Sequence, residues 1–266
     1  MAKIKTGDLV LFFYNDSKKW LLKISKKEQF HSHIGIIKHV DAIGKEFGSR
    51  LITNKDKYVY LLKPTIHDHI MKMQHGTQIV YPKDLGYIAA RTGLQSGQKI
   101  VEIGTGSGSL TTFLASIVKP RGHVYTFDVE PKFMEIAEKN IKKAGMSKYV
   151  TMHNQNLKKS KKLPVDECDL AIIDLGAPWE VLPQVRKMLK SSGSVVAICP
   201  TMNQLEKLSI AFVENEFSDI ESTEHILRRI EARDGKTRHS YQGLGHTTYL
   251  AMARKVYFNK KRSRKK

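Results

Sequence analysis

A glycine-rich segment between two apolar stretches most constrains the fold. Lys99 to Ile103 is a short apolar run with the length of a buried strand, and Gly104-Thr105-Gly106-Ser107-Gly108-Ser109 follows it directly. The next run, Leu110 to Val118, has the composition of an apolar helix. Glycines at alternating positions let the backbone turn tightly and lie close to a ligand at the carboxyl end of a strand. The segment therefore predicts a strand, a ligand-binding turn and a helix.

Strand and helix patterns alternate from about residue 84 onward, which is typical of a parallel sheet covered on both faces. A helix is expected at Asp84–Thr92, and others between the first six strands. The last two strands flank a polar loop at 232–246 and should form a terminal hairpin. The predicted strands are Lys99–Ile103, His123–Asp128, Tyr149–His153, Asp169–Leu175, Ser194–Cys199, Ile220–Ile230 and Thr247–Ala253. We therefore expect an α/β fold with a seven-stranded sheet, parallel except at one edge.

The first sixty or so residues follow another pattern. Short apolar runs alternate with Asn-, Gly- and Lys-rich punctuation, which favours a small sheet of hairpins. Pro64 closes this region, and Thr65–Met73 has the pattern of a short linker helix. Only two cysteines occur, Cys168 and Cys199, both in apolar runs, so a reducing compartment is the simpler interpretation and we expect a cytoplasmic protein.

The charge balance favours a polyanionic partner. The chain has a formal charge of +19 and a pI near 9.8. Eight of these positive charges lie from Arg254 to the C-terminus, and the remainder of the chain still carries +11. This excess favours phosphate contacts with nucleic acid, although a basic proteome with a solvated surface is the alternative. We expect neither a membrane segment nor a metal site, because no apolar stretch is long enough and no histidine spacing matches a zinc pattern.

Two acids follow predicted parallel strands at the edge where ligands bind. Asp128 stands 24 residues after Gly104, where a carboxylate can accept hydrogen bonds from ribose hydroxyls. Asp174 ends the fourth strand, where it could accept from the N6 amino group of an adenine and stabilise the positive charge that develops when N1 is methylated. The alternative for Asp174 is a helix cap or a salt bridge with a lysine. Ser109 stands where a dinucleotide fingerprint requires glycine, which disfavours nicotinamide binding.

The glycine loop, the following helix and Asp128 together resemble the nucleoside-methyltransferase version of the Rossmann-like fold, which binds S-adenosylmethionine. Three stretches are more specific: Gln78–Asp84, Ile173–Trp179 and His246–Lys255 look like the tRNA (adenine-N1)-methyltransferases that modify the T-loop. The resemblance covers about residues 76–256. It implies a class I (Rossmann-like) S-adenosylmethionine-dependent methyltransferase with a small N-terminal β-domain, which acts as a homotetramer on adenine 58 of tRNA, and also on adenine 57 in some archaeal members.

On this resemblance Asp174 is the catalytic carboxylate and Tyr81 lines the target-base pocket. The sequence departs from the family at Asn156, where an acid is common, and at Asp128, where glutamate is usual. The expected domains are the N-terminal β-domain at 1–64, a linker helix and substrate-lining segment at 65–83, the catalytic domain at 84–256 and a basic tail at 257–266. The expected cofactor-binding residues are Glu102, Gly104, Thr105, Gly106, Ser107, Gly108, Ser109, Leu110, Asp128, Val129, Asn156, Leu157 and Asp174.

Some of the basic residues around the terminal hairpin loop are expected to touch tRNA phosphates, although the sequence does not tell which. Those singled out as substrate contacts are Arg228, Arg233, Arg238 and His246, beside Arg229, Lys236 and His239. The run 158–162 is expected to be a solvated loop between two strands or a further phosphate contact. Two competing functions are a noncatalytic tRNA-binding subunit, which the intact glycine loop, Asp128 and Asp174 disfavour, and a protein isoaspartate methyltransferase, which the net charge and the segment from Asp174 to Trp179 disfavour.

Overall fold

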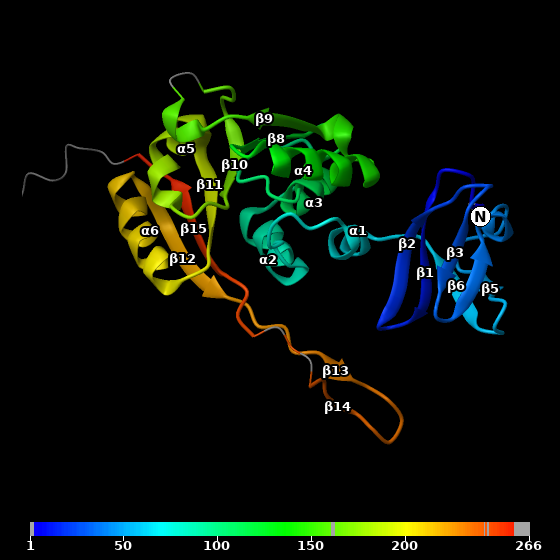
Figure 1. The fold of residues 1–266 in the computed structure, drawn as a ribbon. Coiled ribbons are helices and arrows are strands. Elements are labelled where there is room, and N and C mark those ends of the chain that lie inside the picture. The colour runs from blue at the N-terminus through cyan, green and yellow to red at the C-terminus, as the bar shows by residue number, and fades with distance from the viewer. Residues whose placement is uncertain (1–2, 161–162, 242, 244, 258–266) are drawn as a thin grey trace, which may run out of the picture. The chain divides into compact units, whose positions relative to one another are not determined.

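The computed structural model describes residues 3–160, 163–241, 243 and 245–257 (Figure 1). The chain divides into two compact units, Met1–Met73 and Gln74–Lys266. Each unit buries its own hydrophobic core: Val10, Phe12 and Leu61 belong to the first, and Val101 and Ala171 to the second. No helix in the described part of the chain is long and apolar enough to cross a membrane.

The first unit is the small β-domain that the hairpin-like pattern predicts. It contains a four-stranded antiparallel sheet in the order β2-β1-β6-β5 and a separate two-stranded β3-β4 hairpin. Its last element, α1, starts at a capping box in which Thr65 and Asp68 bond reciprocally. The elements are β1 (Leu9–Asn15), β2 (Lys18–Lys23), β3 (Gln29–Ser32), β4 (Gly35–Lys38), η1 (His39–Ala42), β5 (Arg50–Ile52), β6 (Tyr58–Leu62) and α1 (Ile66–Lys72).

The second unit contains the predicted seven-stranded sheet, in the order β12-β15-β11-β10-β7-β8-β9. β15 is antiparallel to both β11 and β12, so the reversed strand lies one place in from the edge rather than at the edge. The described pairs β11-β10, β10-β7, β7-β8 and β8-β9 are parallel. The strands are β7 (Lys99–Ile103), β8 (His123–Asp128), β9 (Val150–Asn154), β10 (Cys168–Ile173), β11 (Leu189–Cys199), β12 (Phe217–Glu224) and β15 (Tyr249–Lys255).

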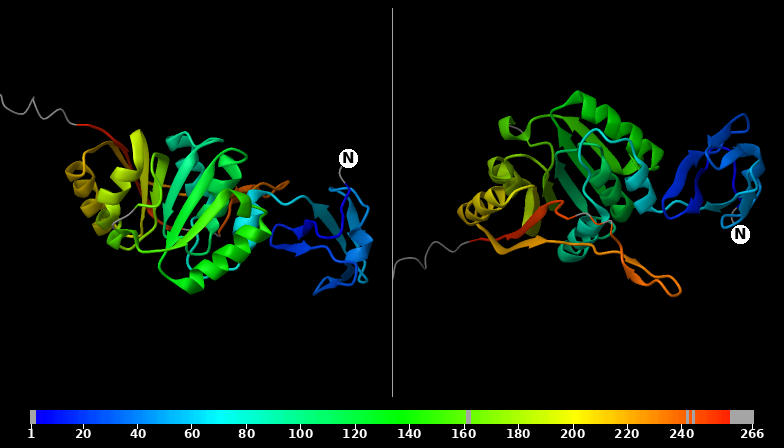
Figure 2. Two further views of the ribbon diagram at one scale, coloured as in Figure 1. Left: turned by 90° about the horizontal axis from the view of Figure 1, so that it is seen from above. Right: turned by 60° about the horizontal axis from the view of Figure 1, so that its bottom comes forward.

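Helices lie on both sides of this sheet (Figures 1 and 2). Local chemistry fixes several of their ends: Pro82 and Pro131 stand in first turns, and Gly93 ends α2 in the left-handed conformation at φ 63°. The helix predicted at Asp84–Thr92 is thereby confirmed, with a start two residues earlier. The helices are α2 (Pro82–Thr92), α3 (Ser109–Val118), α4 (Pro131–Lys143), α5 (Leu182–Met188) and α6 (Met202–Glu214), with the 3-10 turns η2 (Ser147–Tyr149), η3 (Leu157–Lys159) and η4 (Pro178–Val181).

Two sequence-based expectations fail here. Between β9 and β10 the described residues form only η3, so the α-helix expected between these strands is wrong; this Lys-rich stretch offers no apolar face for the sheet. Lys161 and Lys162 lie outside the described residues, as does the tail from 258 onward. The strand predicted to reach Ile230 is also wrong beyond Glu224, where β12 ends.

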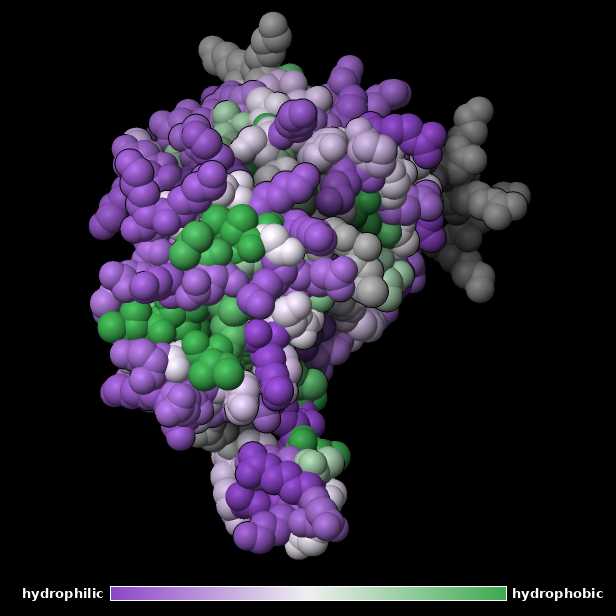
Figure 3. Space-filling view, turned by 90° about the vertical axis from the view of Figure 1, so that its right-hand side faces the viewer, coloured by the Kyte–Doolittle hydropathy of each residue, from purple (hydrophilic) through white to green (hydrophobic). Residues whose placement is uncertain are grey.

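After β12 the chain leaves the sheet and returns through a separate small hairpin. This hairpin pairs β13 (Ile230–Glu231) with β14 (Arg238–His239). We call residues 226–246 the arm; it is the orange ribbon below the sheet in Figure 1. The lobe at the bottom of Figure 3 is its hairpin, and the surface of that lobe is mainly hydrophilic in this view.

Candidate active site

The glycine loop lies directly against the end of β10. Gly104 has φ +103°, and a β-carbon there would lie 2.1 Å from the carbonyl oxygen of Asp174. The Asp174 amide donates to the carbonyl oxygen of Ile103 at 2.8 Å, which continues the β7-β10 pairing. Because the backbones are this close, only glycine fits at position 104. The first and fourth parallel strands therefore bring the loop and the Asp174 carboxylate to one edge.

Asp128 braces this loop from the neighbouring strand. Its Oδ2 accepts a hydrogen bond from the Gly106 amide at 2.9 Å, and its Oδ1 accepts from the Glu130 amide at 3.0 Å. Gly108 takes the left-handed conformation that starts α3, and a β-carbon there would lie 3.0 Å from Ala137 of α4. The acid and the glycines thus form one connected structure at the ends of β7 and β8.

Residues 74–80, which lie within the stretch expected to contain the linker helix and the substrate-lining segment, cover the glycine loop. Ser107 Oγ accepts from the amides of Gly76 and Thr77 at 2.9 and 3.1 Å. The buried Asn140 side chain of α4 donates to the carbonyl oxygens of Gln74 and Ser107 at 2.8 and 2.9 Å. The segment 74–80 is therefore fixed over the glycines. An asparagine on the apolar face of an amphipathic helix was the signal that could have indicated this contact.

Two neighbouring hollows surround these groups. The one at the loop is lined by Asp174 and by residues of the covering segment, and the other is a pocket of about 200 Å³ with mixed polar and apolar walls. The loop hollow is lined by Thr77, Gln78, Ile79, Val80, Gly104, Thr105, Gly106, Ser107, Ser109, Leu110 and Asp174. The pocket is lined by Ile103, Phe127, Asp128, Val129, Gln155, Asn156, Leu157, Lys158, Leu175, Ala177, Glu180 and Val181.

Most residues expected to bind the cofactor meet at these two hollows. Sequence reasoning assigned no cofactor contact to Thr77–Val80 or to Leu175–Val181, although parts of both lie in stretches that carry the family resemblance. Neither wall belongs to a strand or an α-helix, so neither has a periodic signal that marks it as part of a binding site. Glu102 is the clear exception: its side chain is fully buried and Oε2 accepts from Thr111 Oγ1 at 2.5 Å. Burial raises the pKa of Glu102 to about 8. It faces α3 rather than either hollow.

Asp174 has the electrostatic surroundings of a functional carboxylate. Burial, and secondarily repulsion from Asp128, raise its pKa to about 6. Tyr81 is the residue before α2, and its hydroxyl accepts from Gln78 Nε2 at 3.2 Å. Tyr81 does not itself line the loop hollow but adjoins Val80, which does. The two residues expected to act on the substrate therefore lie at the same edge of the sheet.

The expected RNA-contacting residues lie on the arm rather than in the hollows. Arg228, Arg233 and Arg238 are exposed, and Arg238 pairs with Glu231 at 3.1 Å. His246 contacts Glu224 Oε1 at 2.7 Å and the carbonyl oxygen of Pro200 at 3.0 Å, and these two acceptors raise its pKa. The arm thus presents its arginines to solvent while its C-terminal end is tied to the ends of β11 and β12.

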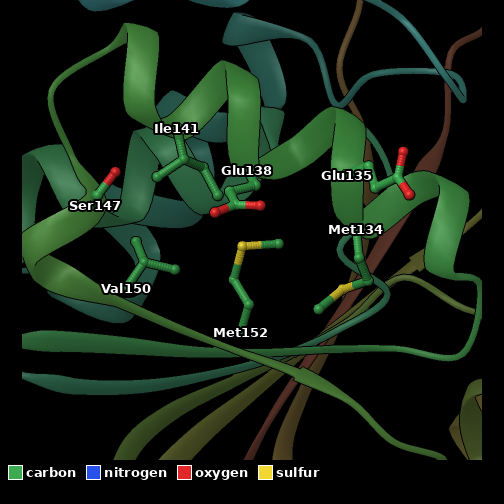
Figure 4. A pocket seen from close by; sticks show the side chains of 7 residues that line it. All are labelled: Met134, Glu135, Glu138, Ile141, Ser147, Val150 and Met152. Carbon is green, nitrogen blue, oxygen red and sulfur yellow. The ribbon is translucent and has the colours of Figure 1, made fainter.

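A separate pocket of about 430 Å³ lies between α4 and the edge strand β9. Figure 4 shows Met134, Glu138 and Ile141 on its helix side and Val150 and Met152 on its strand side. None of its lining residues belongs to the two hollows. In the described part of the chain, no group of three or more His, Cys, Asp or Glu side chains could hold a metal ion.

A parallel sheet with a glycine loop after its first strand, an acid after its second and a carboxylate after its fourth defines the class of S-adenosylmethionine-dependent methyltransferases. The protein-family model described as tRNA methyltransferase complex GCD14 subunit matches residues 57–265 of this chain. The chain belongs to this tRNA methyltransferase family.

Individual relatives agree with this assignment. The tRNA (adenine(57)-N(1)/adenine(58)-N(1))-methyltransferase TrmI of Methanocaldococcus jannaschii is 32% identical to this chain over an aligned length of 261 residues. The match covers 89% of this chain and 91% of that protein. A solved tRNA (m1A58) methyltransferase TrmI from Aquifex aeolicus has a TM-score of 0.84 and 31% identity, covering 97% of this chain and 100% of that one. A Thermotoga maritima structure described as a SAM-dependent O-methyltransferase has a TM-score of 0.90 and 30% identity, covering 97% of this chain and 96% of that one.

Proposed function

We propose that this protein transfers a methyl group from S-adenosylmethionine to N1 of an adenine in the tRNA T-loop, at position 58, with the neighbouring adenine 57 as a second candidate acceptor. The observation that carries the proposal is that Asp174 lines the same hollow as Gly104 and Gly106. Relatives named for this reaction match nearly the whole chain, which supports the acceptor atom as well as the fold.

The two hollows suit the two halves of the cofactor. Asp128 and Asn156 offer oxygen acceptors at the pocket of about 200 Å³, and Phe127, Leu157 and Leu175 contribute apolar parts of its wall. This combination of apolar and polar groups fits a nucleoside. The remaining cofactor-binding residues proposed here are Gly104, Thr105, Gly106, Ser107, Gly108, Ser109, Leu110, Val129 and Asp174, with Glu102 acting indirectly through Thr111 and α3.

The protein's own task is to position the base and support the charge that forms on it. Bound S-adenosylmethionine supplies a methyl group on a positively charged sulfur. As the N1 lone pair forms a bond to the methyl carbon, the carbon–sulfur bond breaks and its electrons go to sulfur, so the adenine gains a positive charge. In our proposal the Asp174 carboxylate accepts a hydrogen bond from N6, which orients the ring and stabilises that charge. Tyr81 forms a wall for a base removed from its stack.

The direct test is incubation of the purified protein with labelled S-adenosylmethionine and unmodified tRNA, followed by nucleoside analysis. We expect 1-methyladenosine, and tRNA variants lacking adenine 58 or adenine 57 separate the two positions. A methyl group on a ribose oxygen, or no transfer despite cofactor binding, contradicts the proposal.

The competing functions give different results in the same assay. A noncatalytic tRNA-binding subunit would bind tRNA without binding the cofactor. The contacts of Asp128 and Asp174 with the glycine loop instead favour cofactor binding. A protein isoaspartate methyltransferase would label an isoaspartyl peptide, and the +19 charge argues for the polyanion instead. We further propose that the protein works in the cytoplasm and forms a homotetramer. Light scattering, which measures the mass of the particle in solution, tests the tetramer.

A further inference from the structure

A buried carboxylate outside both hollows contacts three other side chains, and the four residues come from three segments of the chain. Asp84 is fully buried, and each of its oxygens lies 2.8 Å from Lys83 Nζ. The Thr247 hydroxyl donates to Asp84 Oδ2 at 3.2 Å and accepts from Lys83 Nζ at 2.6 Å. His225 lies beside this group, with Nδ1 3.5 Å from Asp84 Oδ1, although this nitrogen makes no hydrogen bond to any residue that the structure describes. We call these four residues the Asp84 junction.

The Asp84 junction holds both ends of the arm against the start of α2. The arm comprises residues 226–246, so His225 directly precedes it and Thr247 directly follows it. Lys83 and Asp84 stand in the first turn of α2, immediately after Tyr81 and Pro82. A single carboxylate therefore connects the exposed basic arm to the helix whose first residues adjoin the target-base pocket.

The same side of α2 continues this contact toward β12. The Tyr87 ring packs on His225 with centroids 4.1 Å apart, and its hydroxyl donates to Glu221. Arg91 donates to Glu221 at 2.7 Å and pairs with Asp219 at 3.1 Å. These outer groups are partly exposed: the Asp219 side chain retains 52% exposure. They are screened by water, so the buried junction is the stronger constraint.

Burying an ion pair is a costly way to dock a helix, and apolar side chains of similar volume would serve stability as well. What charges add is a required geometry, because the Lys83 ammonium must meet Asp84 and Thr247 at the same time. We propose that Asp84 is a positioning residue, which fixes the basic arm relative to Tyr81 so that a tRNA loop held by the arm presents its adenine to Asp174. This inference rests on the proposed function.

The test compares Asp84→Asn with Asp219→Asn, which makes the same chemical change on an exposed partner of the same helix. We expect Asp84→Asn to raise the KM for tRNA about tenfold while the cofactor Kd stays within about twofold, because both hollows lie elsewhere. Amide hydrogen exchange across 225–247 should become faster. Asp219→Asn should leave the KM, the Kd and this exchange unchanged.

A merely structural role would lower the unfolding temperature of Asp84→Asn but leave the KM for tRNA and the exchange of the arm unchanged, and that result overturns the proposal. If Asp84→Asn fails to fold, Thr247→Val removes only the bridging hydroxyl and should show the same pattern to a smaller degree; an unchanged KM and exchange there also overturn it. If the unaltered protein does not methylate tRNA, the proposed function fails, and exchange across 225–247 still decides whether Asp84 anchors the arm.

Discussion

The Asp128 carboxylate accepts a hydrogen bond from the Gly106 amide at 2.9 Å, so the acid expected to hold the ribose also braces the glycine loop. This relationship joins the ends of β7 and β8. It means that a change at Asp128 affects both the shape of the loop and the polar contacts of the pocket beside it.

Asp128→Asn should weaken binding of S-adenosylmethionine. An amide has one acceptor oxygen where the carboxylate has two, and both oxygens of Asp128 are engaged with Gly106 and Glu130. Losing one charge-assisted hydrogen bond should raise the Kd about ten- to hundredfold, measured by titration calorimetry. Asp166→Asn, at a side chain with 96% exposure, is the control. Equal affinities for the two variants would contradict a role for Asp128 in the site.

Asp174→Ala should lose methyl transfer while most of the cofactor affinity remains, because the other residues that line the two hollows are unchanged. The carboxylate is proposed to orient the adenine and stabilise the charge on it, so its removal should lower the single-turnover rate by about 10²–10³-fold. The Kd for cofactor, measured in parallel, shows whether the site remains folded. Near-normal turnover would remove Asp174 from the mechanism.

Methylation should decline below about pH 6. Burial raises the pKa of Asp174 to about 6, so this carboxyl is protonated below that pH and ionised above it. Only the ionised form carries the negative charge that stabilises the methylated ring, and it is the stronger acceptor for N6, which gives a rate that rises with pH through this value and then levels off. The measurement is kcat/KM for tRNA as a function of pH. An Asp174→Asn variant with the same inflection would assign it to another group.

Gly104→Ala should abolish cofactor binding, because φ is +103° and the added carbon would lie 2.1 Å from the Asp174 carbonyl oxygen. The matched control is Gly86→Ala in α2, where an added carbon meets nothing within 4 Å. This control should stabilise the protein by about 0.5–1 kcal/mol through the helix propensity of alanine. Denaturant unfolding and cofactor titration of both variants check these outcomes. Cofactor binding by Gly104→Ala would show that β10 can move away.

Binding of tRNA should weaken steeply with salt, because the arm presents exposed arginines to the phosphates. Arg228→Ala and Arg233→Ala should each lower the slope of log K against log salt by about 1, with little change in sequence preference. Fluorescence anisotropy with labelled tRNA over a range of salt concentrations measures this slope. An unchanged slope in both variants would place the phosphate contacts elsewhere on the protein.

The sequence by itself determined the sheet and the residues at its edge. Apolar runs of strand length predicted β7 and β8 to the residue, and the parallel order placed the glycine loop, Asp128 and Asp174 at one edge because strand ends meet there. It failed where contacts between distant segments decide the outcome. β12 ends at Glu224, although the predicted strand continued to Ile230. At this point Glu224 contacts His246 and His225 lies beside Asp84, so the chain leaves the sheet.

Tertiary structure alone decided how the remaining polar groups are used. Glu102 precedes the glycine loop closely in sequence, yet strand alternation turns its side chain toward Thr111 and away from the hollows. Asn140 and Ser107 fix a covering segment that lies far from both of them in the sequence. The contact of Ser107 with Gly76, for example, joins residues 31 positions apart. Local pattern determines which face of an element is apolar, whereas the partner of a buried polar side chain depends on which distant segments the fold brings together.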